Sequence, residues 1–502
     1  MKHRFTRLVG VVAAATVALA LGAVSAQAAP PASVVDPNRL GSLTINKLIE
    51  DSTNGADNAP LANVEFTIWQ VPGIDLSTNQ GWLDATAMTP AAAEALVSGP
   101  GTTDITDSNG QIVFGDLPVG LYLVKETGTP TGVIPSGPFL ITLPTTVTTE
   151  AGSAWNYNPV VYPKNNVVDI TKDVDNAGVL ETGRPITYTL TADIPTGFNV
   201  DDVAALPTGY WISDTMPAGL TFNSASAAIV GPNGTALTEG TDWNLIQGSA
   251  AQSGPNGAWV ITPDDASSQF FIVFTEAGLL RLQNLGTVTS DNRVQVTITA
   301  TATESGTLVN NAELWPTGPD SGVNRPNDQV EVKYGDLLVT KADASGEIEG
   351  FLPGMHFQIW AVTHQFGETP TLSTEDPNAT LVRDGLVTGP DGTLAVNGLR
   401  ASNFADGAAI TATNPDGFIT YFLVETQAPA GFELLAEPMP FTIEFNSDVQ
   451  IGLTVPVLDA PINGGFDLPA TGGIGTVVVY AAGVAVMAAG LVLLVTRRRR
   501  TN

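Results

Sequence analysis

One pattern of alternating residues occurs twice in the chain, and it constrains the fold more than any other feature. Residues 43–71 read LTINKLIEDSTNGADNAPLANVEFTIWQV, and residues 338–362 read LVTKADASGEIEGFLPGMHFQIWAV. Each copy has an alternating segment with a lysine, a polar loop, and a second alternating segment that ends in Ile-Trp-x-Val. A period of two is typical of β-strands with one buried face, and distant self-similarity indicates repeated units. We therefore expect two copies of one β-domain.

Each copy continues with the same order of turns and strands. Asp107–Gly110 before Leu121–Glu126 corresponds to Pro390–Gly392 before Tyr421–Glu425. Asn-Gly and Asp-Gly between alternating segments are hairpin signals, so each copy is predicted to be a small β-sandwich. A helix of one or two turns is expected only at Thr89–Val97, which is rich in alanine.

The two ends of the chain predict export and attachment to the cell surface. Residues 1–8 hold three basic side chains, an apolar segment follows, and Ala26-Gln27-Ala28 supplies the small residues of a signal-peptidase site. Residues 474–496 are uncharged and long enough to cross a bilayer, and four arginines follow them. Immediately before this span stands Leu468-Pro469-Ala470-Thr471-Gly472.

The order of motif, span and basic tail resembles the sorting signal of Gram-positive surface proteins that sortases cleave. The resemblance implies cleavage between Thr471 and Gly472, with Leu468 and Pro469 as part of the recognised motif and Thr471 as the acyl donor. It also implies a precursor held briefly in the plasma membrane, and a final attachment to peptidoglycan by a housekeeping sortase.

Charge and composition exclude several classes of function. The chain has 20 basic and 50 acidic residues, and residues 29–471 have 13 against 50, a balance of −37. Such a polyanion repels nucleic-acid phosphates, so no nucleic-acid partner is expected. The absence of cysteine excludes disulfides and thiolate sites. His356 and His364 form no ligand or catalytic pattern, so we predict no enzyme, no metal and no cofactor.

The predicted fold class is all-β, with three tandem immunoglobulin-like β-sandwiches. Residues between the two repeats have strand patterns of their own, such as PITYTLTA at 185–192. The predicted divisions are a signal peptide at 1–28, sandwiches at 29–165, 166–333 and 334–467, and the sorting signal at 468–502.

Both repeats hold the same three polar residues in the same order. Each has a lysine on its first strand, a glutamate on a middle strand and an asparagine at the end of its last strand: Lys47, Glu126 and Asn165, and Lys341, Glu425 and Asn463. The lysine-to-glutamate spacings are 79 and 84 residues, and the glutamate-to-asparagine spacings are 39 and 38. The first and last strands of a sandwich commonly lie side by side, so the three side chains are expected to meet.

An apolar site lowers the pKa of a lysine and raises the pKa of a glutamate, which leaves a nucleophilic amine beside a proton-donating acid. The amine can then attack the amide carbon and expel ammonia, which forms an internal isopeptide bond and lowers the mass by about 17 Da. The alternative is that these lysines lie exposed at strand edges, with ordinary salt-bridge partners.

A family resemblance extends this prediction. YFLVETQAPAGF at 421–432 resembles the E-box of Gram-positive backbone pilins and collagen-adhesin B-type domains, in which the glutamate promotes such a bond. LYLVKETGTPTG at 121–132 is a looser match. The middle domain resembles collagen-adhesin A-type sandwiches. That resemblance implies a bond between Lys172 and Asn311, promoted by Asp214, with Asn310 as the nearby alternative.

A further lysine, outside these three sites, lies in a motif of its own. VVYPKN at 160–165 resembles the Tyr-Pro-Lys-Asn motif of backbone pilins, in which the lysine attacks the sortase-held threonine of the next subunit. The resemblance implies a head-to-tail polymer between Thr471 and Lys164, made by a pilus-polymerising sortase, with tip and basal pilins as partners. Adjacent strand residues point to opposite faces, so Lys164 is expected to face outward and Asn165 inward.

These observations favour a major shaft pilin on the cell surface. The main alternative is a monomeric wall-anchored adhesin whose sandwiches form a stalk for binding a host receptor. A basal pilin is a third hypothesis.

Overall fold

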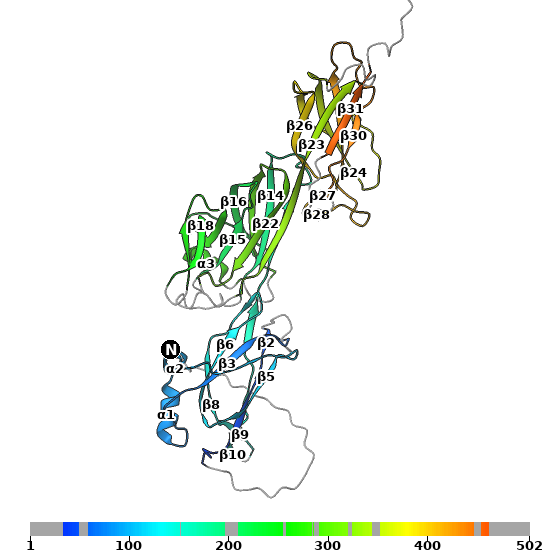
Figure 1. Cartoon of the computed structure of the whole chain (residues 1–502). Helices are drawn as coiled ribbons and strands as arrows, with labels where there is room; N and C mark the ends of the chain where they lie inside the picture. Colours follow the sequence, from blue (N-terminus) through cyan, green and yellow to red (C-terminus); the bar gives the residue numbers. More distant parts are fainter. Residues whose placement is uncertain are drawn as a thin grey trace, which may run out of the picture. The chain divides into compact units, whose positions relative to one another are not determined.

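The structure is a computed structural model dominated by β-strands (Figure 1). It describes residues 34–49, 59–150, 152–195, 209–254, 258–283, 285, 291–319, 324–343, 352–445 and 453–460. The chain divides into two compact units, residues 1–333 with 406–408 and residues 334–405 with 409–502. Strand β23 (Asn327–Asp343) contains the division between them.

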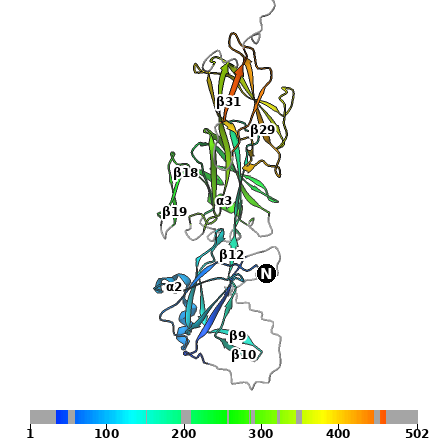
Figure 2. The ribbon, with the colours of Figure 1, turned by 45° about the vertical axis from the view of Figure 1, so that its right-hand side comes forward.

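The strands of residues 41–167 form two facing layers and a small ribbon. The first layer contains β11-β1-β5 and β2-β12-β7, the second is β4-β3-β6-β8, and β10-β9 form the ribbon, which lies apart from both layers (Figure 2). Their bounds are β1 Gly41–Asn46, β2 Leu48–Ile49, β3 Glu65–Gln70, β4 Thr102–Ile105, β5 Gln111–Leu117, β6 Gly120–Gly128, β7 Val133–Ile134, β8 Phe139–Leu143, β9 Thr145–Thr149, β10 Gly152–Asn156, β11 Val160–Val161 and β12 Lys164–Val167.

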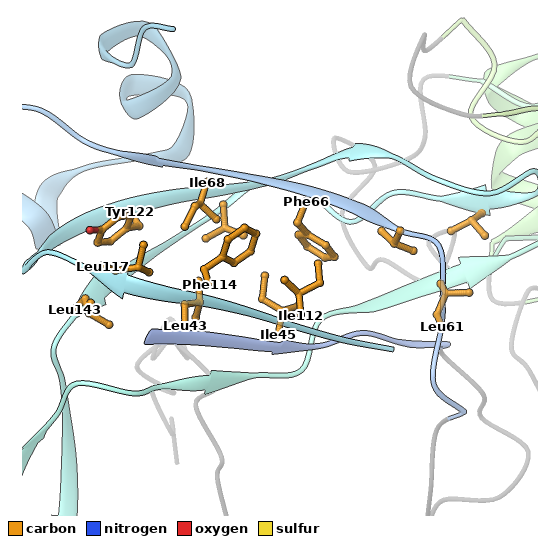
Figure 3. Packing of buried hydrophobic residues seen from close by; sticks show 13 residues of the cluster. Leu43, Ile45, Leu61, Phe66, Ile68, Ile112, Phe114, Leu117, Tyr122 and Leu143 are labelled. Carbon is orange, nitrogen blue, oxygen red and sulfur yellow. The ribbon is translucent and has the colours of Figure 1, made fainter. Parts of the chain in front are cut away.

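The core of this sandwich follows from residue alternation. In β1 every second residue is buried, so Leu43 and Ile45 face the second layer while their neighbours are partly exposed. Figure 3 shows these side chains against Phe114 of β5 and opposite Phe66 and Ile68 of β3. The packed interior between two layers is therefore specified by the period of two that the sequence shows.

Two helices cover the outer face of β3 and β6. Helix α1 (Asn79–Ala87) was not predicted, whereas α2 (Pro90–Leu96) confirms the helix expected at Thr89–Val97. The Thr89 hydroxyl accepts the Ala92 N–H at 3.2 Å and caps α2. Because the helices bury Leu121 and Leu123 from outside, β6 is apolar on both faces.

The strands of residues 170–315 form two sheets, ordered β13-β14-β21-β16-β17 and β19-β18-β20-β15-β22. Phe222 of β16 stacks on Phe270 of β20 with ring centroids 4.2 Å apart, which joins the sheets in one core. A short helix, α3 (Glu276–Leu282), was also not predicted. The strand bounds are β13 Ile170–Asp175, β14 Pro185–Asp193, β15 Trp211–Thr215, β16 Leu220–Val230, β17 Thr235–Leu237, β18 Trp243–Gln252, β19 Trp259–Pro263, β20 Gln269–Phe274, β21 Arg293–Ala302 and β22 Gly306–Trp315.

The strands of the second unit repeat the arrangement of the first sandwich. One sheet is β25-β24-β29-β30, and the other is built on β23, which pairs antiparallel with β26 and parallel with β31. The bounds are β24 His356–His364, β25 Ala379–Val387, β26 Thr393–Arg400, β27 Phe404–Ala405, β28 Ala408–Ala409, β29 Phe418–Gln427, β30 Met439–Phe441 and β31 Leu453–Asp459.

The hairpin prediction for the two glycine turns is wrong. The turn at Asp107–Gly110 joins β4 to β5, and the turn at Pro390–Gly392 joins β25 to β26, but these strands belong to different sheets. Gly110 and Gly392 have φ of 70° and 73°, so the sequence correctly marks tight reversals. A turn residue fixes the local reversal and does not fix which strands pair afterwards.

Candidate functional site

Lys47, Glu126 and Asn165 meet in the interior of the first sandwich. The Lys47 Nζ donates to Glu126 Oε1 at 2.6 Å and to Asn165 Oδ1 at 2.6 Å. The Asn165 Nδ2 donates to Glu126 Oε2 at 2.7 Å. All three residues are buried. The carboxyl of Glu126 thus contacts both the Lys47 amine and the Asn165 amide nitrogen. A group that carries a proton from one to the other must occupy this position.

The backbone brings these side chains together at a parallel pair of strands. In β12, Asn165 is in register with Ile49 of β2, two residues after Lys47. The Lys47 N–H donates to the Gly110 carbonyl at 2.7 Å, and a Cβ on Gly110 would lie 2.4 Å from the Lys47 carbonyl oxygen. The glycine of the turn therefore allows the close approach that holds Lys47 in place.

Two further residues complete this site and were not predicted. The Lys47 Nζ lies 5.9 Å from the ring centroid of the buried Phe66. The Ser136 hydroxyl donates to Glu126 Oε1 at 2.6 Å. The repeat contains the signal for Phe66, since Phe357 stands at the same place before Ile-Trp in the second copy.

Burial sets the protonation of the first site. Desolvation lowers the pKa of Lys47 from its ordinary 10.5, and the Glu126 carboxyl opposes that shift. An amine whose pKa is lowered is more readily present in the neutral, nucleophilic form. The geometry and the lowered pKa of Lys47 both suit attack on the adjacent Asn165 amide.

The middle sandwich holds a similar cluster. Lys172 of β13 forms a fully buried ion pair with Asp214 of β15, and its Nζ lies 5.3 Å from the Tyr188 ring centroid. Desolvation lowers the pKa of Lys172 and raises the pKa of Asp214. These opposite directions favour a neutral amine beside a protonated acid.

The placement of the middle asparagine corrects the sequence prediction. Asn311 was expected to face Lys172, but it is partly exposed and lies on the outer face of β22, in register with Thr215. Asn310, the alternative, is fully buried, and its side chain partly offsets the rise that desolvation causes in the pKa of Asp214. Among the described residues, the polar atoms of Asn310 complete no hydrogen bond of normal geometry. Leu308 and Leu314 lie an even number of residues from Asn310 and so share its face of β22, whereas Glu313 shares the face of Asn311. The sequence therefore already indicated which of the two asparagines faces the interior.

The third cluster surrounds Lys341 in the second unit. Its Nζ lies 3.2 Å from Glu425 Oε1 and 5.7 Å from the Phe357 ring centroid. The Leu435 N–H donates to Glu425 Oε2 at 2.9 Å, ten residues after the glutamate, as Ser136 is ten residues after Glu126. The predicted acceptor Asn463 lies outside the described residues.

Lys164 lies on the opposite face of β12 from Asn165. It is exposed, whereas Asn165 is 2% exposed. The alternation that directs Asn165 into the interior therefore leaves the Lys164 side chain on the surface. This is the arrangement that the sequence predicted for the two residues.

The predicted signal peptide, the sorting motif with Thr471 and Gly472, and the span at 474–496 all lie outside the described residues. Within the described part of the chain, no helix is long and apolar enough to cross a membrane. The same described residues contain no group of three His, Cys, Asp or Glu side chains placed to hold a metal.

Comparison with known proteins decides the family. Residues 41–166 match the Gram-positive pilin subunit D1, N-terminal domain, and residues 463–502 match the LPXTG cell wall anchor motif. Fimbrial subunit type 1 of Actinomyces viscosus is 31% identical over 548 residues, which cover 99% of each chain. The chain belongs to the Gram-positive pilin family. The pilin is therefore a fimbrial subunit anchored to the cell wall, and its homologues are named as fimbrial subunits rather than enzymes.

Solved structures agree with this family. The full-length major pilin SpaD of Corynebacterium diphtheriae matches with a TM-score of 0.62 and 25% identity over 85% of the pilin and 98% of SpaD. The fimbrial protein FimP of Actinomyces oris matches with a TM-score of 0.53 and 28% identity over 86% of the pilin and all of FimP. The predicted all-β fold of tandem sandwiches is confirmed.

Proposed function

We propose that this pilin is the shaft subunit of the pilus, and that a pilus-polymerising sortase joins each copy to the next through Thr471 and Lys164. The observation that carries the proposal is the contrast between two neighbours on β12. Lys164 is exposed, while Asn165 is buried against Lys47 and Glu126. Strand β12 thus presents the Lys164 amine for a bond between subunits, and next to it the Asn165 amide for a bond within the subunit.

The polymerisation step is an acyl transfer. The neutral Lys164 amine attacks the carbonyl carbon of Thr471, which the sortase holds as a thioester. An amide bond forms, the carbon–sulfur bond breaks, and the enzyme thiol leaves with the proton from the amine. The acyl donor and the amine lie on different surfaces of the subunit, so the subunits join head to tail. Such a contact does not close into a dimer, and its repetition from subunit to subunit produces a filament. Tip and basal pilins would end the filament, and a housekeeping sortase would transfer it to peptidoglycan.

Inside the first sandwich, the Lys47 Nζ attacks the Cγ of Asn165. Glu126 takes a proton from the amine through Oε1 and supplies one to the amide nitrogen through Oε2, in line with the hydrogen bonds that it accepts from these two groups. The Nζ–Cγ bond forms, the Cγ–Nδ2 bond breaks, and ammonia leaves. We propose the same step in the middle sandwich for Lys172 and Asn310, with Asp214 as the acid.

Each such bond would stabilise the subunit by restricting its unfolded chain. Lys47 and Asn165 are 118 residues apart, and a cross-link that closes a loop of this length contributes roughly 4–5 kcal/mol in the chain-entropy model. The bond also joins the strand region of Lys47 to the last strand of the same sandwich, which would resist extension when the filament is pulled.

An immunoblot of boiled cell-wall extracts tests the shaft assignment. Covalent polymers survive boiling in detergent, so antibody to the pilin should detect a ladder of bands rising in steps of one subunit. A monomeric adhesin would give one band at subunit mass. That single band would refute the proposal and favour the alternative of an adhesive stalk.

A further inference from the structure

In the third cluster a carboxylate occupies the place of the carboxamide. The Lys341 Nζ forms an ion pair with the Asp459 carboxylate, and both side chains have no exposed surface. Asp459 ends β31, the last described strand, as Asn165 lies on β12 in the first sandwich. The residue that contacts Lys341 is thus an aspartate four positions before the predicted Asn463.

The register of the strands makes the two positions equivalent. In the first sandwich, Asn165 pairs in a parallel ladder with the residue two places after Lys47. In the third, Asp459 pairs in a parallel ladder with Asp343, two places after Lys341. The lysine-to-acceptor separation is 118 residues in both cases. Because side chains two apart in a strand share a face, the same geometry delivers each acceptor to its lysine.

We propose that Lys341 forms its internal amide bond with Asp459, and that this bond releases water instead of ammonia. The proposal rests on the internal cross-linking proposed above and names the acceptor of the third site. The Nζ–Cγ bond forms, and one Cγ–O bond breaks. An ammonium and a carboxylate together hold the atoms of one amide and one water, so the step requires no other reactant. Glu425, 3.2 Å from Nζ, is placed to move a proton from the amine to the departing oxygen.

A permanent ion pair explains this cluster less well. The site buries the Lys341 amine with two carboxyl groups, and the buried Asp459 Oδ2 has no hydrogen-bond partner among the described residues. A buried charge in excess and an unpaired buried oxygen are both unfavourable. Condensation removes the amine, one of the two carboxyl groups and one buried oxygen together, and it leaves Glu425 as the acidic group of the cluster.

Peptide mapping of the pilin released from cell walls tests the proposal. Digestion followed by high-resolution tandem mass spectrometry should find the segments around Lys341 and Asp459 joined, about 18 Da lighter than their summed mass. In Asp459→Asn, ammonia replaces water as the leaving group, so the joined peptides should have the same mass and fragments as in the wild type. Asp459→Ala should leave Lys341 unmodified, and Asn463→Ala should leave the Lys341–Asp459 bond intact.

A bond from Lys341 to Asn463 in the wild type, recognised by a loss of about 17 Da and by fragments that retain an unmodified Asp459, would overturn the proposal. An unmodified Lys341 in wild-type pilin would overturn it as well. Neither result bears on the shaft assignment, because the ladder on the immunoblot depends on Lys164. If Asp459→Ala fails to fold, the comparison between the wild type and Asp459→Asn still decides the acceptor.

Discussion

Cells in which Lys164 is replaced by arginine should lose the entire ladder of covalent pilin polymers and retain a single band at subunit mass. Arginine keeps the positive charge and a long side chain at this exposed position. Its guanidinium stays protonated at any physiological pH, so it offers no nucleophile to the Thr471 thioester. The expected change is therefore complete, and an immunoblot of boiled wall extracts measures it.

The matched control is Lys125→Arg. Lys125 also has an exposed side chain, 44% accessible and paired with Glu94, but it lies on β6 and outside the pilin motif. Its replacement should leave the ladder unchanged. The Lys164→Arg monomer should also keep the mass deficit of about 17 Da at Lys47 and Asn165, which shows that the first sandwich is intact. A wild-type ladder in Lys164→Arg would show that another amine joins the subunits.

Replacing Glu126 by glutamine should leave the Lys47 amine unreacted, because a carboxamide cannot shuttle the proton between Lys47 and Asn165. The peptides around Lys47 and Asn165 should then separate on digestion. Loss of a cross-link over 118 residues removes roughly 4–5 kcal/mol, and the unfolding transition of this sandwich should fall by about 10–15 °C. Peptide mapping and thermal unfolding measure the two effects.

The same variant should acquire a pH dependence that the wild type lacks. Burial lowers the pKa of Lys47 below 10.5 and Glu126 opposes this, so removing the Glu126 charge lowers it further. Between that lowered pKa and 10.5 the unfolded chain binds more protons than the folded one. The free energy of unfolding of Glu126→Gln should therefore rise with pH in this window. In the wild type Lys47 would be an amide and could not titrate.

Glu65→Gln is the control for both measurements. Glu65 lies on the neighbouring strand β3 and accepts from the Thr127 hydroxyl at 2.6 Å, but it does not contact Lys47 in the described structure. Its replacement should preserve the bond and the unfolding temperature. A joined Lys47–Asn165 peptide in Glu126→Gln at wild-type abundance would contradict the role assigned to the acid.

The sequence predicted those parts of the sites that follow from the repeat and from strand alternation. Alignment of the two copies identified the lysine and the glutamate in each, and alternation separated Lys164 from Asn165. Turn chemistry predicted the reversals at Gly110 and Gly392 but not the pairing of the flanking strands, since tertiary packing decides that pairing. Helices α1 and α3 are too short for a clear helical period, and they lack the run of alanines that marked the equally short α2.

The acceptors were harder to predict, because each depends on the phase of a single strand. Asn310 and Asn311 are adjacent, and only the parity of Leu308 and Leu314 separates the buried residue from the exposed one. At the third site the buried residue is an aspartate rather than an asparagine, and the alternating burial of Val455, Val457 and Asp459 directs it to the interior. The register of a parallel strand, rather than residue type, identifies the partner of the lysine.

The most direct test of the account is tandem mass spectrometry of pilin released enzymatically from native cell walls, with every lysine assigned as amine or amide. We predict four joined pairs: Lys47 with Asn165, Lys172 with Asn310, Lys341 with Asp459, and Lys164 with Thr471 of the next subunit. Unmodified side chains at all four lysines would contradict this prediction and leave a wall-anchored protein without covalent cross-links.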